Sequence, residues 1–131
     1  MYKSVISLTT LFGLLLLVSC NAKKNQGPTP LQIDSKTATK IFDKDDYLFF
    51  DVRTVKEHKA RAIPNTPNIP VHELENRIDE LEIYRDKKII VYCRSGNRSK
   101  LGTDILTKNG YDAVNLIGGM KQWDGPIISE N

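Results

Sequence analysis

The chain has 131 residues, a length that suits a single domain, and contains no internal repeat. Its 19 Lys and Arg exceed its 16 Asp and Glu, which gives a formal net charge of +3. The basic residues are scattered and are not interleaved with aromatic residues, so the composition argues against a nucleic-acid-binding protein.

Residues 1–19 have the pattern of a signal peptide. Lys3 supplies a positive charge, and residues 5–18 form a mostly apolar stretch that is too short for a comfortable membrane span. The junction at residues 17–20, Leu-Val-Ser-Cys, resembles the bacterial lipobox, where the cysteine becomes the lipidated first residue of the mature protein. We therefore expect acyl chains on Cys20 that anchor the protein in a membrane by burying methylene groups. The alternative is a simple N-terminal anchor with an incidental cysteine.

Residues 20–30 are polar and contain Gly and Pro, as in a flexible tether between a lipid anchor and a domain that spans residues 31–131. A lipid on Cys20 predicts a location in the bacterial cell envelope, with the domain in the periplasm or otherwise outside the cytoplasmic membrane. The other cysteine, Cys93, then has no partner for a disulfide. A free thiol in an exported, oxidising compartment favours a reactive role over a packing role.

Short apolar segments alternate with helical patterns through the rest of the chain. The predicted strands are residues 31–33, 47–52, 89–92 and 113–116. The predicted helices are residues 35–43, 71–83 and 98–108, with Ser35 as the N-cap of the first and Asn109-Gly110 as the end of the last. This alternation predicts an α/β domain with a parallel sheet, whose ligands bind beyond the carboxyl ends of the strands.

The stretch that follows the strand at residues 89–92 has the composition of an anion-holding loop. Cys93 ends the strand, and a helix is expected to begin near Arg98 or Ser99, with Leu101, Ile105 and Leu106 at helical spacing. Backbone N–H groups of the loop, the helix dipole and the flanking arginines all favour a thiolate over a thiol. A lone cysteine at a strand end is usually an inert core residue, but the two arginines have no packing role there.

The run at residues 93–99, Cys-Arg-Ser-Gly-Asn-Arg-Ser, resembles the active-site loop of the rhodanese family, the single-domain sulfurtransferases. Related cysteine phosphatases have one more residue between the Cys and the Arg than separates Cys93 from Arg98. The shorter loop resembles the sulfur-transferring branch, whose pocket closes around a persulfide. Further motifs of the family follow in the expected order: Asp51-Val52-Arg53 with Glu57, Asn68-Ile69-Pro70, and Gly118-Gly119-Met120 with Trp123.

The resemblance implies a rhodanese-like α/β fold with a central parallel five-stranded sheet flanked by helices. It implies Cys93 as the catalytic residue and a substrate-binding loop made of Arg94, Ser95, Gly96, Asn97 and Arg98. Asp51, Arg53 and Glu57 are expected to support the site. Asp51 would accept hydrogen bonds from loop backbone, and Arg53 would pair with Glu57. Gly118 and Gly119 are expected to turn the chain, and Trp123 to pack a terminal helix.

The implied activity is the transfer of sulfane sulfur from a small anionic donor such as thiosulfate to a thiol or cyanide, through a persulfide on Cys93. Arg98 is expected to face the persulfide with its N–H and its side chain, and Arg94 to meet the donor. We expect a monomer without cofactor or metal, with His58 and His72 at the surface. Two alternatives stay open: a non-catalytic or persulfide-carrier module, and a cysteine phosphatase.

The chain departs from the family pattern in the segment after Glu57. Where the pattern has Gly-His-Ile and then Gly-Ala, the chain has Arg61-Ala62-Ile63 and Asn65-Thr66. Asn65 is able to replace its glycine because asparagine tolerates the left-handed backbone conformation. Arg61 either adds positive charge near the pocket or is solvated.

Overall fold

The computed structural model describes residues 31–130, so the predictions for residues 1–30 lie outside the described residues. The element order is β1 (Gln32–Ile33), α1 (Ser35–Thr39), β2 (Tyr47–Asp51), α2 (Val55–Ala60), η1 (Val71–Glu73), η2 (Glu75–Tyr84), β3 (Lys88–Tyr92), α3 (Asn97–Lys108), β4 (Asp112–Leu116) and α4 (Gly119–Gln122), where η marks a 3₁₀ helix. Over the described range, no helix combines the length and the apolar character needed to cross a membrane.

The sheet has four parallel strands in the order β1-β4-β3-β2. The predicted α/β class and the parallel pairing are therefore confirmed, whereas the expected count of five strands is wrong. Where a further strand would lie beside β2, only an isolated bridge joins Asp51 to Asn68. Pro67 precedes this segment, and a proline has no N–H to extend a ladder of hydrogen bonds.

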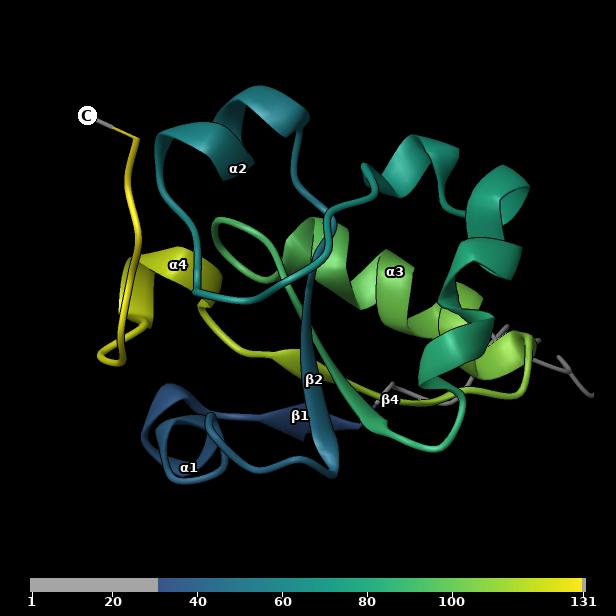
Figure 1. The fold of residues 1–131 in the computed structure, drawn as a ribbon, viewed down its shortest axis with the longest axis horizontal. Coiled ribbons are helices and arrows are strands. Elements are labelled where there is room, and N and C mark those ends of the chain that lie inside the picture. Colours follow the sequence, from purple (N-terminus) through teal and green to yellow (C-terminus); the bar gives the residue numbers. More distant parts are fainter. Residues whose placement is uncertain (1–30, 131) are drawn as a thin grey trace, which may run out of the picture.

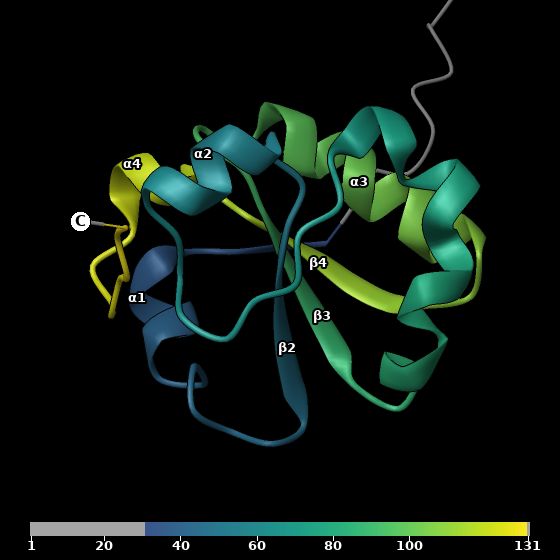
Figure 2. The ribbon, with the colours of Figure 1, turned by 45° about the horizontal axis from the view of Figure 1, so that its top comes forward.

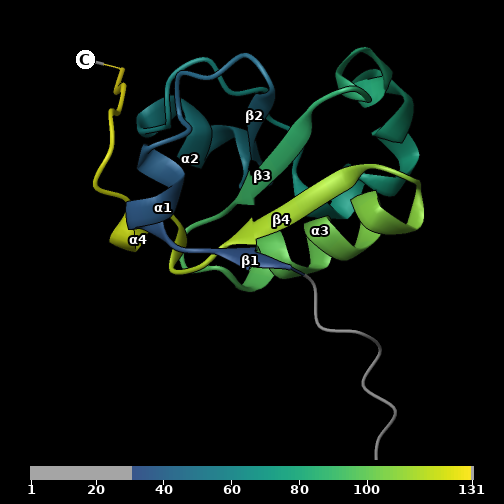
Figure 3. The same cartoon turned by 90° about the horizontal axis from the view of Figure 1, so that it is seen from below.

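Each face of the sheet is covered by its own hydrophobic core, because successive strand residues point to opposite sides. Phe50 and Val91 pack with α3 and with the η1–η2 segment in one core, whereas Phe49, Ile90 and Tyr92 pack with α1 and α4 in the other. Figures 1 and 2 show α1 and α4 on one side of the strands and α3 on the other. Figure 3 shows β1 beside β4, with α3 running along that part of the sheet.

Two predicted helices differ from the observed ones. The segment at residues 71–83 forms two 3₁₀ helices, because within η2 only Leu81 is buried and Ile83 is 75% exposed, which leaves no continuous apolar stripe. The helix predicted at residues 35–43 ends at Thr39, and its N-cap is Asp34, whose Oδ1 accepts the N–H of Thr37 at 2.7 Å.

The α3 helix begins at Asn97, close to the predicted start, and Asn109 and Gly110 end it as predicted, with Gly110 at φ 84°. Leu101, expected on its apolar side, is 53% exposed. The buried face instead includes Gly102, where a Cβ would lie 3.1 Å from Val52 Cγ1. The glycine thus allows α3 to lie close to β2 and β3, which brings the helix N-terminus to Cys93.

Candidate active site

Cys93 lies at the carboxyl end of β3, and the following loop folds around its sulfur. The residue is 1% exposed, and the Gly96 N–H donates to Sγ at 3.1 Å. Gly96 has φ 103°, a conformation that glycine adopts without strain. Ser99, on the first turn of α3, places its Oγ 3.3 Å from Sγ. The predicted arrangement of inward-facing loop N–H groups beside a helix start is present in the structure.

The surroundings of Cys93 favour its thiolate. Burial by itself raises the pKa of the thiol, but the Ser99 hydroxyl and the N–H groups of Ser99, Gly96 and Ser95 oppose this effect. The balance of these contributions lowers the pKa below the ordinary value of the thiol. Because the thiolate is the nucleophilic form of cysteine, the sulfur is prepared for attack without a separate general base.

Ser99 is a functional candidate that was predicted as the last residue of the loop at residues 93–99 but was given no role of its own. Its side chain is fully buried, and its carbonyl oxygen accepts the Thr103 hydroxyl at 2.8 Å, which fixes the residue on the helix. A hydroxyl in this position donates its single proton to the thiolate. The available sequence signal was the serine that directly follows Arg98 at the predicted helix start.

We predict that Ser99→Ala raises the pKa of Cys93, because it removes the leading contribution that opposes burial. The rate of Cys93 alkylation by iodoacetamide, measured against pH, should then rise at higher pH than in the wild type. At neutral pH, loss of a hydrogen bond to a charged group should slow alkylation about tenfold or more. Ser95→Ala is the matched control, because it keeps the backbone N–H that acts on the sulfur. Superimposable pH profiles for Ser99→Ala and the wild type would contradict this role.

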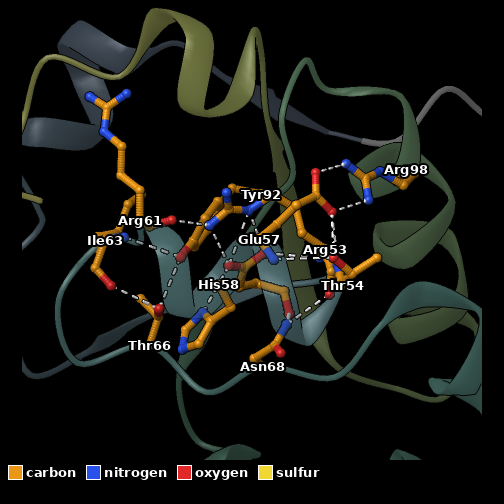
Figure 4. Close-up of polar contacts among 11 residues, drawn as sticks. Arg53, Thr54, Glu57, His58, Arg61, Ile63, Thr66, Asn68, Tyr92 and Arg98 are labelled. Atoms are coloured by element: carbon orange, nitrogen blue, oxygen red, sulfur yellow. Dashed lines mark hydrogen bonds and ion pairs between the residues drawn. The ribbon is translucent and has the colours of Figure 1, made fainter. Parts of the chain in front are cut away.

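Glu57 connects α2 to the loop through Arg98. The Arg98 Nη1 and Nη2 donate to the two Glu57 carboxylate oxygens, each at 2.8 Å (Figure 4). Glu57 also forms a capping box with Thr54 at the start of α2. The guanidinium of Arg98 thus binds Glu57 and does not have the predicted position facing the persulfide. The predicted pairing of Arg53 with Glu57 is wrong for the same reason.

The ion pair between Glu57 and Arg98 stabilises the fold over a defined pH range. The hydrogen bonds from Arg98 lower the pKa of Glu57 from 4.5 to about 2. A carboxyl whose pKa is lower in the folded state stabilises the fold above its ordinary pKa. This contribution is therefore complete above about pH 4.5 and is lost as the pH falls through about 2.

Asp51 and Arg53 form a second pair, buried beneath the first. Arg53 Nη2 lies 2.7 Å from Asp51 Oδ2 and donates to the Arg61 carbonyl oxygen at 2.7 Å. The Arg53 N–H donates to Asp51 Oδ1 at 2.9 Å, which agrees with the expected role of Asp51 as an acceptor for backbone. His58 is half-buried and its Nδ1 lies 2.9 Å from Asp51 Oδ2, a contact that was not predicted, whereas His72 is exposed as predicted.

The α4 helix closes the other side of the loop. The N–H groups of Met120 and Lys121 donate to the carbonyl oxygens of Cys93 and Arg94 at 2.9 and 3.0 Å. Gly119 has φ 51°, and a Cβ there would overlap the Cys93 carbonyl oxygen and lie 2.8 Å from the Arg94 carbonyl oxygen. Gly119 is therefore needed for the close approach of α4 to the loop, in addition to the predicted turn.

Two further predictions concern Trp123 and Asn65. Trp123 is buried against Phe42 and Phe49, as predicted for its packing role. Asn65 has φ 59°, which confirms the predicted left-handed conformation. Within residues 31–130, no group of three or more His, Cys, Asp or Glu is arranged to hold a metal ion.

A buried cysteine with a lowered pKa, held in a loop between a parallel strand and a helix, is an environment typical of reactive cysteines. The model of the rhodanese-like domain family matches residues 34–125, and the chain belongs to this family.

Two kinds of relative agree with this assignment. The chain is 35% identical over 94 residues to a sulfurtransferase of Allochromatium vinosum, covering 70% of this chain and 86% of that protein. Among solved structures, a rhodanese-related protein from Thermoplasma volcanium is 32% identical with a TM-score of 0.69, covering 76% of this chain and 99% of that one. A rhodanese-like domain protein from Staphylococcus aureus is 25% identical with a TM-score of 0.68, covering 77% and 99% of the two chains.

Proposed function

We propose that this protein is a sulfurtransferase that carries sulfane sulfur on Cys93. The observation that supports this most directly is the environment of Sγ, which receives the Gly96 N–H and the Ser99 hydroxyl and has a lowered pKa. The relative from Allochromatium vinosum, named as a sulfurtransferase, supports the same class of reaction. The proposed sulfur donor is thiosulfate, and the proposed acceptor is cyanide or a thiol.

The reaction proceeds in two displacements. In the first, the Cys93 thiolate attacks the outer sulfur of thiosulfate, the S–S bond of thiosulfate breaks, and sulfite leaves with the bonding electron pair. In the second, cyanide or a thiolate attacks the outer sulfur of the Cys93 persulfide and regenerates the thiolate. Loop N–H groups stabilise the persulfide anion in the way an oxyanion hole stabilises an oxyanion.

Arg94 is suited to meet the anionic donor. It directly follows Cys93 and is exposed, whereas the Arg98 guanidinium is held by Glu57. Arg98 then acts on the loop mainly by fixing it to α2. The expected role of Arg94 toward the donor is thus part of the proposal, whereas the expected position of the Arg98 side chain at the persulfide is not.

The test is a thiosulfate:cyanide assay that follows thiocyanate formation, run beside a phosphatase assay with an aryl phosphate. Turnover with thiosulfate that exceeds turnover with the phosphate ester supports the proposal. The converse would favour the cysteine phosphatase. Stoichiometric loading of Cys93 without turnover would identify the persulfide-carrier module instead.

We also propose that the domain is tethered to a membrane of the bacterial cell envelope by lipid on Cys20, outside the cytoplasm. The motif at residues 17–20 supports this, together with the polar tether that follows it. A lipid anchor would hold a small-molecule sulfurtransferase at the membrane surface without requiring a protein partner.

We predict that Cys20→Ser converts the protein from a membrane-bound to a soluble form. Acyl chains contribute ~0.8 kcal/mol for each buried methylene group, so their loss removes the anchoring energy. Fatty-acid labelling followed by membrane fractionation measures the change, with the otherwise unaltered chain as the control. Equal labelling of the wild type and of Cys20→Ser would contradict lipidation.

A further inference from the structure

A cavity of about 430 Å³ lies beside the active-site loop, between the loop, the end of α2 and α4. Three of its lining residues are the exposed cations Arg61, Arg94 and Lys121. Each comes from a different one of these three segments, so the fold gathers positive charge at the cavity from separate parts of the chain. Arg94 is the residue that follows Cys93, which places the cavity at the mouth of the site.

The charge of this cavity is not neutralised by its own lining. Glu57 and Arg53 also line it, but each is paired, Glu57 with Arg98 and Arg53 with Asp51. In the portion of the chain that the structure describes, the three exposed cations form no ion pair. The cavity therefore has an excess of positive charge that an anionic ligand would complement.

The size and the remaining lining of the cavity favour an organic anion over an inorganic one. Ala60 and Met120 add apolar surface between the cations. A volume of this order is in the range of sites for small organic molecules, which combine apolar walls with a few placed polar groups. A sulfur oxyanion has no carbon skeleton to contact this apolar surface.

Arg61 contributes its side chain to the cavity independently of its structural role. Its backbone carbonyl oxygen accepts the Arg53 guanidinium, an interaction that any residue at this position would provide. Its backbone is extended, with φ −165° and ψ 126°, which side chains of all kinds adopt. Figure 4 shows its side chain extending away from the Arg53 and Glu57 network. The family pattern has glycine here, so the guanidinium is a departure from that pattern.

We propose that Arg61, Arg94 and Lys121 bind the carboxylates of an organic persulfide donor, and that Arg61 determines the preference for this donor over thiosulfate. The inference rests on the proposed sulfur transfer and adds its substrate class. In the reaction, the Cys93 thiolate attacks the outer sulfur of R–S–SH, and the S–S bond of the donor breaks. R–S⁻ leaves with the electron pair, and the proton remains on the new Cys93 persulfide. No oxidant or reductant is required.

The test compares glutathione persulfide, which carries two carboxylates, with thiosulfate as donors for the full-length chain. Arg61→Ala should raise KM for glutathione persulfide about three- to tenfold, as expected for the loss of a charged contact, and should raise KM for thiosulfate less. Arg61→Lys should retain most of the wild-type KM. Lys108→Ala, which removes one positive charge at the far end of α3, is the matched control and should leave the ratio of the two KM values unchanged.

A second measurement does not depend on persulfide turnover. S-methylglutathione has the same carboxylates and no transferable sulfur, so it should compete with thiosulfate in the wild type and compete more weakly in Arg61→Ala. No inhibition of the wild type, or equal changes in KM for both donors in Arg61→Ala, would overturn the carboxylate subsite while thiosulfate turnover still upheld sulfur transfer. Failure of both donors to load Cys93 would overturn the proposed function, and this inference with it.

Discussion

Cys93→Ser is expected to abolish sulfur transfer while the protein stays folded. Serine has nearly the same shape as cysteine, so the core around residue 93, which is 1% exposed, remains filled. Its hydroxyl is not ionised near neutral pH and does not form a persulfide, so the covalent step is lost entirely. The measurement is thiocyanate formation from thiosulfate and cyanide, together with mass spectrometry of the protein after incubation with thiosulfate.

The control for folding is the urea midpoint of Cys93→Ser, which should stay near that of the wild type. Wild-type protein should gain the mass of one sulfur atom after incubation with thiosulfate, and the variant should not. Appreciable turnover by a folded Cys93→Ser protein would place the reaction elsewhere in the chain.

Gly119→Ala should have the second large effect, on stability and on activity together. A Cβ at this position would overlap the Cys93 carbonyl oxygen, and φ 51° is unfavourable for alanine. The opposing atoms are loop backbone, which α4 itself holds through two hydrogen bonds. We expect a loss of about 1–3 kcal/mol in the free energy of unfolding, as for other overpacked sites, and a loss of most activity.

Gly110→Ala is the matched control for Gly119→Ala. Gly110 also has a positive φ, 84°, but a Cβ there would meet the end of the Arg85 side chain, at 3.4 Å, and no backbone atom. The two variants share the backbone strain and differ in the overlap with the active-site loop. Urea unfolding and thiosulfate turnover of both separate these effects. Similar losses of activity in the two variants would show that the close approach of α4 is unimportant for the loop.

The active-site loop was predictable because its chemistry is local in the sequence. The strand before Cys93, the glycine at position 96 and the helix that follows lie within a short segment, and each has its own sequence signal. The left-handed Asn65 was predictable for the same reason, since it depends on the residue type and the local turn.

The partner of Arg98 was not predictable, because it depends on tertiary structure. Glu57 lies far from Arg98 in the sequence and close to Arg53, so the sequence favoured a local pair. In the fold, Arg53 pairs with Asp51, and Glu57 pairs with Arg98 at the end of the loop. The same holds for His58, whose contact with Asp51 depends on how α2 packs against the end of β2.

The number of strands and the two 3₁₀ helices differ from the prediction because packing overrides the local sequence pattern at both places. The Asp51–Asn68 bridge does not extend toward the start of β2, because Pro67 has no N–H to donate to that strand. In residues 71–84, the apolar residues have helical spacing, but too few of them reach the core to impose a continuous α-helix.

The contacts of β1 and α4 determine when the reactive site is complete during synthesis. Gln32 pairs with Asn115, and amides of α4 bind the carbonyl groups of Cys93 and Arg94. A nascent chain that has reached the end of α3 therefore contains its cysteine in a loop without these contacts. Parallel pairing of distant segments is also slow to form. The loop thus acquires its full set of contacts only after translation has passed Lys121, so chains that terminate earlier would have the local groups around the thiol without the amides of α4 that hold the loop.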